Sequence, residues 1–492
     1  MGVIIIEDME ISRNNTHIHI PVSLGLTTLR ANEQKGMPIV IGSFITPEPT
    51  ILMSKPEEEW YLNMLVAPSL RNGETGVITK LPPGVKDYYI RLGLLNKETR
   101  VVEVAPSELH KSETSIYSYR NTDPLVLLRD SFFTGINNAK LVSFFNSPAI
   151  HEEASRLGIG MIENPPSTTT NNKANIRNPS IIAKYGFNML RGVILTREEE
   201  LDRLVSCFSP YVEGIWLKLA LGSGGDYVTH IKKISKSTII EARNNMYDTA
   251  KNFFYNGGFS DKFSSFWAEK EFAPAGFPFV VEIDVKNIGK AINGSTQFIT
   301  HKNGKVDVVF HSEQITSPEG EYLGSRPLIS KDYEMTKLLT DVLRKEAEKV
   351  GRYNINENGY YGIQGIDWFI VENGSKIEYY LTELNSRPII TTPAMIVAQK
   401  LGFTNWINTD VTVERPIRTI KDYKEEVGRM HTDPRNLRTG RGIVVPIAFR
   451  TLTTSRGEQI PSTQFKVLVC GRSHAECEDI MADMVKNKIS FN

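Results

Sequence analysis

Two short segments contain side chains that could bind a divalent metal ion. Residues 365–371 read Gly-Ile-Asp-Trp-Phe-Ile-Val, and residues 380–388 read Tyr-Leu-Thr-Glu-Leu-Asn-Ser-Arg-Pro. Glu383 and Asn385 are two positions apart on an expected β-strand, so their side chains share one face. Carboxylate and amide oxygens are hard ligands of the kind that Mg²⁺ prefers, with nucleotide phosphates completing the coordination. These segments therefore predict a magnesium site.

Asp367 must join this pair across a β-hairpin, and the connecting turn decides whether it does. A two-residue turn at 373–374 would place its carboxylate on the opposite face of the sheet. A three-residue loop over 373–375 pairs Asp367 with residue 381, so that all three metal-ligand side chains converge. We therefore predict the three-residue loop. The alternative is a polar sheet face with solvated acids, which the apolar neighbours disfavour because a buried acid needs a partner.

Arg387 follows two residues after Asn385 and is expected on the same face of the strand. A guanidinium at this position could neutralise the negative charge that develops during phosphoryl transfer. The hairpin thus combines candidate metal ligands with a candidate catalytic cation.

A lysine followed by small residues forms a second candidate site. Lys218 lies near the end of an expected strand, and the loop after it contains Gly222, Ser223, Gly224 and Gly225. Glycines let backbone N–H groups approach a phosphate closely, and a lysine supplies a point charge. Taken alone, a flexible hairpin loop with a surface lysine is the more common explanation.

Two further expected strands carry acceptor groups that could hold a purine edge and ribose hydroxyls. They cover residues 266–272, with Glu269 and Phe272, and residues 278–286, with Glu282. Taken alone, each is explained more simply as an alternating strand with solvated carboxylates.

The elements around these motifs predict a chain of the mixed α/β and α+β class. Residues 38–46, 77–79 and 101–104 are β-rich, with helical stretches between them, which predicts an open α/β layer over 1–135. Between 213 and 383 the chain is mainly strand-like, with helices among the strands. This mixture predicts α+β lobes with antiparallel sheets.

Apolar periodicity and capping residues mark the helices. Residues 331–351 form the clearest helical pattern, and Gly351 is expected to end it. Cys207 lies in a second periodic segment, on the side expected to be buried. Ser473 and Glu476 have capping-box spacing and predict the start of the last helix.

The three chemical motifs, in this order, resemble the ATP-grasp superfamily, which includes biotin carboxylase and the D-alanine–D-alanine ligases. The match spans about residues 170–412, roughly half the chain. The resemblance implies a nucleotide held between two α+β lobes, with ATP and Mg²⁺ as cofactors. It implies that Lys218 contacts phosphate beneath a mobile loop of Gly222, Ser223, Gly224 and Gly225. It further assigns the adenine strand to Glu269–Phe272, a ribose-side acid to Glu282, the metal ligands to Asp367, Glu383 and Asn385, and the catalytic arginine to Arg387.

The resemblance also implies an earlier lysine that contacts the nucleotide. Lys173 is about the right distance before the following motif, and Lys184 is the alternative. Arg326 is a further candidate for a catalytic group near the substrate carboxylate, although a surface turn explains it more simply. Residues 435–442 concentrate positive charge that could hold an acidic substrate, with a solvated loop as the more ordinary explanation.

The flanking regions narrow the resemblance. The N-terminal segment is similar to a pre-ATP-grasp domain, which gives domains at 1–135, 136–412 and 413–492. The last of these is expected to be a small α+β piece. This arrangement resembles the stand-alone peptide ligases of the pheganomycin ligase type.

The implied reaction begins when a substrate carboxylate attacks the γ-phosphate of ATP. An amine then opens the acyl phosphate to give an amide, with release of ADP and phosphate. We therefore predict a carboxylate–amine ligase of peptide or natural-product biosynthesis. The alternatives are a carboxylase-type ATP-grasp enzyme and a catalytically inactive nucleotide-binding regulatory or scaffold protein.

Composition limits the partners and the cellular compartment. The chain has 492 residues, which predicts about three domains, and its 57 Lys and Arg balance 57 Asp and Glu. A formal charge of zero argues against nucleic acid as the main partner. With three cysteines, no Cys-x-x-Cys pair, and neither a signal peptide nor an apolar stretch of about 18 residues, we expect a cytoplasmic protein without a membrane partner. Small molecules or peptides are the expected substrates, and a homodimer is left open.

Overall fold

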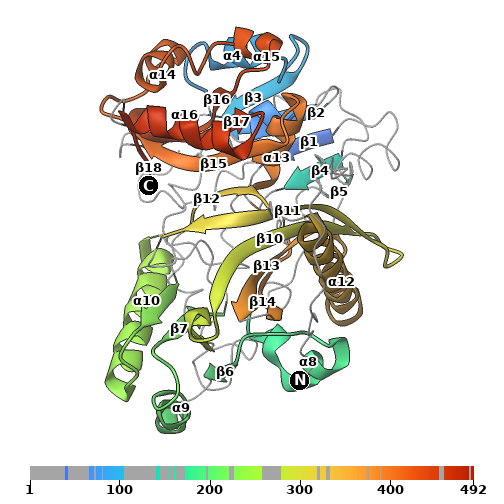
Figure 1. The fold of residues 1–492 in the computed structure, drawn as a ribbon, viewed down its shortest axis with the longest axis vertical. Coiled ribbons are helices and arrows are strands. Elements are labelled where there is room, and N and C mark those ends of the chain that lie inside the picture. The colour runs from blue at the N-terminus through green and yellow to red at the C-terminus, as the bar shows by residue number, and fades with distance from the viewer. Residues whose placement is uncertain are drawn as a thin grey trace.

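A computed structural model provides the structure of this chain. It describes residues 39–42, 66–70, 74–79, 81–104, 140–143, 155, 160–161, 172–195, 198–220, 227–256, 279–317, 322–328, 333–373, 376–387, 389, 391–453, 459–486 and 489–491. Three sheets organise these residues (Figure 1). In this part of the chain, no helix is both long and apolar enough to cross a membrane.

The first sheet is parallel and forms the N-terminal layer. Its strand order is β3-β2-β1-β4-β5, and every described pairing in it is parallel. The predicted α/β layer therefore forms, but its sheet continues past residue 135, the boundary predicted from sequence. The strands are β1 (Ile39–Gly42), β2 (Glu74–Thr79), β3 (Arg100–Val104), β4 (Lys140–Ser143) and β5 (Gly160–Met161).

The second sheet is antiparallel and forms a small lobe, in the lower left of Figure 1. Apolar residues of α9 (Leu201–Phe208) and α10 (Lys236–Asn256) share one core with its strands. Cys207 is exposed, so its predicted burial is wrong. The buried stripe of α9 consists of Leu201, Leu204 and Phe208, and Cys207 lies beside that stripe. The strand order is β6 (Gly192–Leu195), β9 (Phe279–Ile283), β7 (Ile215–Leu219) and β8 (Val228–Ile231).

The third sheet is the largest and joins the middle of the chain to its C-terminal piece. It has nine strands in the order β14-β13-β10-β11-β12-β15-β17-β16, with β18 beside β15. Its pairing therefore crosses the boundary predicted at residue 412. The strands are β10 (Lys290–Thr300), β11 (Val306–Thr316), β12 (Tyr322–Pro327), β13 (Gly362–Asn373), β14 (Lys376–Asn385), β15 (Asn405–Thr412), β16 (Ile443–Thr453), β17 (Gln459–Gly471) and β18 (Ser490–Phe491).

Helix α12 (Tyr333–Asn358) packs against this sheet and is longer than predicted. Gly351 does not end the helix. A Cβ atom at this position would lie 2.5 Å from a methyl group of Val306 and 2.9 Å from the Thr300 hydroxyl. The glycine therefore permits close packing of helix on sheet, a role that sequence alone does not distinguish from a helix stop.

A segment from the N-terminal third of the chain completes the C-terminal core. Helix α4 (Val85–Arg91) shares a core with α14 (Ile420–Val427), β16 and β17. The Tyr88 hydroxyl donates to the Thr432 carbonyl at 2.9 Å, and the Tyr89 hydroxyl donates to the Pro446 carbonyl at 2.7 Å. Short helices α3 (Val66–Ser69), α8 (Pro179–Tyr185), α13 (Thr391–Lys400) and α15 (Arg435–Thr439) and the 3₁₀ turns η2 (Asn175–Arg177), η3 (Glu198–Glu200) and η4 (Val285–Asn287) complete the fold.

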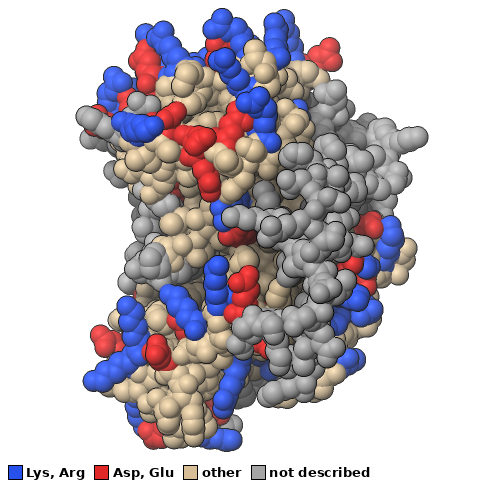
Figure 2. Space-filling model, in the orientation of Figure 1, with Lys and Arg blue, Asp and Glu red and all other residues tan. Residues whose placement is uncertain are grey.

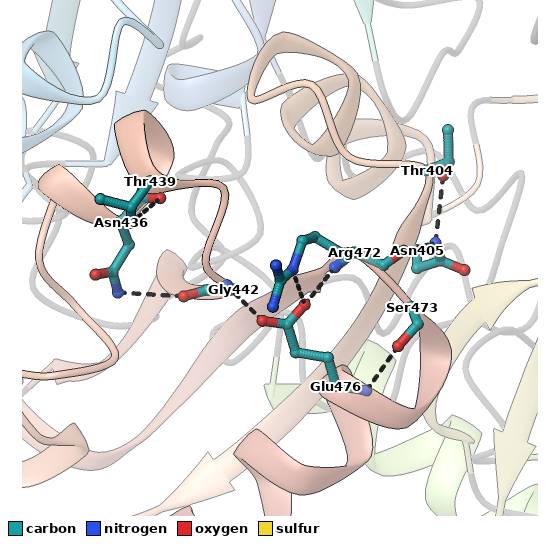
Figure 3. Close-up of polar contacts among 8 residues, drawn as sticks. All are labelled: Thr404, Asn405, Asn436, Thr439, Gly442, Arg472, Ser473 and Glu476. Carbon is teal, nitrogen blue, oxygen red and sulfur yellow. Dashed lines mark hydrogen bonds and ion pairs between the residues drawn. The ribbon is translucent and has the colours of Figure 1, made fainter.

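The predicted capping residues begin α16 (His474–Lys486) in an altered form (Figure 3). The Ser473 hydroxyl accepts the backbone N–H of Glu476 at 3.1 Å, as predicted. The Glu476 carboxylate instead accepts the backbone N–H groups of Gly442 at 2.9 Å and Arg472 at 2.6 Å. One carboxylate thus joins the helix to the end of the basic segment 435–442, so this segment includes a structural anchor.

Charge is mixed on the face shown in Figure 2. Lys and Arg side chains are interspersed with Asp and Glu over the described residues there. This distribution agrees with the formal net charge of zero.

Loss of the Tyr89 hydroxyl should weaken the attachment of α4. We expect Tyr89→Phe to lower the free energy of unfolding by about 1–2 kcal/mol, because a buried hydrogen bond is lost. Chemical denaturation would measure the change. Tyr211→Phe is the matched control, because Tyr211 is 75% exposed. Equal stability of the two variants would contradict a buried role for the Tyr89 hydroxyl.

Candidate functional site

The hairpin of β13 and β14 brings the predicted metal ligands onto one face by a route that differs from the prediction. Asn373 pairs with Lys376, so the turn leaves two residues between the strands and the predicted three-residue loop is wrong. Regular pairing from that turn would put Asp367 opposite Thr382. The register shifts beside Trp368, and Asp367 instead pairs with Glu383. One extra residue in β14, a β-bulge, therefore produces the convergence.

A second segment contacts β14 next to this bulge. The Leu381 backbone N–H donates to the Asn188 carbonyl at 2.7 Å, and Met189 forms a parallel bridge with Leu381. The bulged strand is thus fixed from both sides, by β13 and by the chain that follows α8.

Asp367 is surrounded by hydrogen-bond donors. Its Oδ2 accepts from the Asn385 amide at 2.9 Å, and its Oδ1 accepts from Gln314 at 3.1 Å and from the Ser295 hydroxyl. Ser295 is directly opposite Asp367 in the pairing of β10 with β13. These contacts fix the carboxylate in position on the sheet face.

Burial and the neighbouring carboxylate of Glu383 raise the pKa of Asp367 to about 6. The hydrogen bonds from Ser295 and Asn385 and the positive charge of half-buried Arg387 act in the opposite direction. Burial and the second carboxylate both disfavour the ionised form of Asp367, and the neighbouring donors and Arg387 offset this only in part. A cation placed between them would be favoured electrostatically.

Lys218 projects from β7 in the small lobe and contacts a buried carboxylate. Its Nζ lies 2.5 Å from Glu282 Oε2, while Arg177 contacts Glu282 Oε1. Glu282 is 1% exposed. Glu282 is the counter-ion of Lys218 and Arg177, and its predicted place near a ribose stays a prediction. Burial first, and then the positive charges of Arg177 and Lys173, lower the pKa of Lys218 to about 7, against the opposing effects of Glu383 and Asp367.

Lys173 joins the two groups of charges. Its Nζ lies 3.2 Å from Glu383 Oε1, and its side chain is only 3% exposed. Its backbone N–H donates to the Ala220 carbonyl at 2.9 Å, just beyond the end of β7. Lysines associated with the small lobe therefore meet the acids of the large sheet at one place.

Lys184, the alternative to Lys173, lies away from these acids. Lys184 is exposed on α8 and forms an ion pair with Glu357 at 2.6 Å. The structure thus brings Lys173, and not Lys184, to the paired acids.

Arg326 is not part of this cluster. Its guanidinium donates to both oxygens of Glu313, at 2.7 and 2.9 Å, and its Nη1 lies 2.7 Å from His474 Nε2. Strand pairing places Arg326 on the sheet face of Trp368, opposite to that of Asp367. It therefore links the large sheet to the C-terminal helix.

The remaining predicted residues lie outside the described part of the chain. They are Gly222, Ser223, Gly224, Gly225, Glu269 and Phe272. The predicted phosphate loop and adenine strand therefore stay predictions.

The most important residue that sequence reasoning missed is Arg177. It follows Lys173 by four positions in a short turn, where the Asn172 side chain accepts the backbone N–H of Ala174 at 2.9 Å. Its spacing of four residues after Lys173 was the signal in the sequence that could have identified Arg177. Ser295 and Gln314 were also missed, because their approach to Asp367 depends on strand order.

Comparison with known proteins gives a match in structure alone. No family model matches the sequence, and no curated protein does. A biotin carboxylase from Campylobacter jejuni, solved with β-γ-ATP, has a TM-score of 0.51 and 14% identity, covering 92% of this chain and 91% of that one. The biotin carboxylase domain of 2-oxoglutarate carboxylase from Hydrogenobacter thermophilus, solved with MgADP, ADP and bicarbonate, has a TM-score of 0.51 and 12% identity, covering 92% and 90%. These likenesses confirm the fold predicted from sequence.

Replacement of Asp367 should stabilise the protein when no ligand is bound. The pKa of Asp367 rises from 3.8 to about 6 on folding. Ionisation of Asp367 therefore destabilises the folded protein, increasingly as the pH rises from 3.8 to about 6 and fully above about 6. We expect Asp367→Asn to raise the free energy of unfolding at pH 7.5 by about 1–2 kcal/mol, with the difference vanishing below about pH 4. Urea titrations at both pH values would measure it. A large destabilisation at pH 7.5 would show that the carboxylate is not under electrostatic strain.

Proposed function

We propose that this chain, which has the ATP-grasp fold, is an ATP-dependent ligase that joins a carboxylate to an amine. The observation that carries the proposal is the contact between Lys173 Nζ and Glu383 Oε1 at 3.2 Å. It places a cation suited to phosphate beside acids suited to a metal ion. Phosphoryl transfer needs these two kinds of group at one site.

The acidic face fits Mg²⁺. Asp367, Glu383 and Asn385 offer hard oxygen donors, and Asp367 pairs directly with Glu383 across β13 and β14, where a divalent cation would reduce the repulsion between the two carboxylates. Among the described residues, no three His, Cys, Asp or Glu side chains gather as a metal site. The Asn385 carbonyl oxygen and the phosphates would therefore complete the coordination. This requires the Asn385 amide, which now donates to Asp367, to turn its oxygen toward the metal.

The cationic side fits the phosphates of a nucleotide. Lys173, just before η2, and Lys218, on β7, provide ammonium groups, and Arg387 lies half-buried near Asp367. One similar structure was solved with β-γ-ATP and another with MgADP. Both observations support ATP with Mg²⁺ as the cofactors.

The protein's own residues act mainly by positioning and by neutralising charge. Bound Mg²⁺ would supply further neutralisation of phosphate charge. Lys173 and Lys218 orient the phosphates, and Arg387 stabilises the charge that develops as a substrate carboxylate takes the γ-phosphoryl group. An amine then displaces phosphate from the acyl phosphate, which gives an amide. Water must be excluded meanwhile, and the segment after Ala220 is the proposed loop that does so.

We assign amino acids or short peptides as the acid and the amine, in peptide or natural-product biosynthesis. The resemblance to stand-alone peptide ligases supports this substrate class. A panel of amino acids and short peptides, tested in pairs with Mg²⁺ and ATP, would measure phosphate and ADP release. The expected result is release that requires both an acid and an amine.

The fold match to biotin carboxylase favours one second candidate, a carboxylase-type enzyme. Bicarbonate dependence of ADP release, without any requirement for an amino acid, would select it. Nucleotide binding with no ADP release across the panel would instead select a regulatory or scaffold protein.

Removal of the proposed metal ligands should abolish turnover. We expect Glu383→Ala and Asn385→Ala each to lower the rate of ADP release by at least about 100-fold, because charge at the phosphates is no longer neutralised. Glu372→Ala is the matched control, since Glu372 is an exposed acid on β13. Circular dichroism would confirm folding of each variant. Wild-type turnover in both site variants would sink the assignment.

A further inference from the structure

Glu282 is shared between two cations inside the small lobe. Its Oε2 lies 2.5 Å from Lys218 Nζ, and its Oε1 contacts the Arg177 guanidinium. Trp216 pairs with Glu282 across β7 and β9, so Lys218, two residues further along β7, projects from the same sheet face. The contact with Lys218 is therefore fixed by strand register.

Arg177 is held in place independently of Lys218. Its Nη1 donates to the Leu190 carbonyl at 3.1 Å, while its Nη2 reaches Glu282. Gly192 leaves the necessary room, because a Cβ atom there would lie 3.0 Å from Arg177 Nη1. The planar guanidinium can span these two acceptors at once, whereas a lysine offers a single ammonium group.

With all three side chains ionised, this group carries two positive charges against one negative charge. Arg177 is 6% exposed and Glu282 is 1% exposed, so water compensates this excess poorly. Lys218 is the outermost member, with 14% of its side chain exposed. The excess positive charge is therefore available at Lys218, on the side where Lys173 meets Glu383.

We infer that Arg177 is a positioning residue that shares the charge of Glu282 and thereby leaves the Lys218 ammonium available to a phosphate. This inference rests on the proposed nucleotide function of the site. With both cations present, Glu282 keeps a partner when Lys218 turns to an anion. Without Arg177, Lys218 is left to compensate the charge of Glu282 and is retained there, since a buried carboxylate cannot be left unpaired.

A double-variant experiment tests the inference in the full chain. Calorimetry would measure the affinity for β,γ-methylene-ATP with Mg²⁺ in wild type, Arg177→Met, and Arg177→Met with Glu282→Gln. We expect Arg177→Met to weaken binding by about tenfold or more, and the double variant to recover most of the loss, because the retaining carboxylate is gone. A purely structural arginine predicts no recovery. Lys184→Met is the matched control, since it removes an exposed cation on α8.

A ligand-free measurement separates this inference from the proposed function. Competitive labelling with acetic anhydride across pH reports the pKa of Lys218. The charges that face Lys218 are Arg177 and Lys173, which lower its pKa, and Glu383 and Asp367, which raise it, beside its partner Glu282. We expect the pKa to rise from about 7 in Arg177→Met.

The outcomes of the two measurements are distinct. Wild type that binds no nucleotide would end the proposed function, and the labelling would still decide the role of Arg177. An unchanged Lys218 pKa in Arg177→Met would overturn the inference, as would affinity equal to wild type or a double variant that binds no better than the single one. Arg177→Lys is a further variant. We expect it to bind the nucleotide better than Arg177→Met but less well than wild type, because it restores the positive charge without the planar guanidinium. Thermal melts identify any variant that fails to fold.

Discussion

Repulsion between two carboxylates is the constraint on which the candidate site depends. Asp367 and Glu383 are directly opposite each other on neighbouring strands, and burial strengthens their repulsion. Such a pair persists only because hydrogen bonds and cations surround it. Lys173 supplies a positive charge to Glu383, while Ser295 and Asn385 donate to Asp367. The rest of the fold positions these groups around the two acids.

The proposed metal ligands and Lys218 belong to different sheets. The acids lie on a long hairpin of the nine-stranded sheet, and Lys218 with Glu282 lies on the four-stranded sheet. Separate sheets allow charges of opposite sign to be assembled without placing them all in one core. The candidate site lies where residues of these two sheets approach one another, and the proposed nucleotide with its metal ion would bridge them.

The two faces of the large sheet have different neighbours at the hairpin. Ser295 and Gln314 donate to Asp367 on its face, whereas the adjacent Trp368 is fully buried in the core formed with α12 on the other face. Arg326 lies on the face of Trp368 and connects Glu313 to His474 of the C-terminal helix. Arg326, a candidate from the sequence, therefore lies on the sheet face opposite to that of Asp367. A single bulge decides which residues of β14 join Asp367.

The sequence by itself determined the residue types, their order and the fold. The spacing of Glu383 and Asn385 required a shared face on any strand, and the order of the motifs indicated the ATP-grasp fold. Only the tertiary structure decided the register, since the bulge beside Asp367 has no local signature. It also decided between Lys173 and Lys184, and it revealed Arg177, because contacts between distant segments depend on how sheets and turns pack. Local spacing follows from backbone periodicity, whereas the pairing of buried charges follows from three-dimensional proximity.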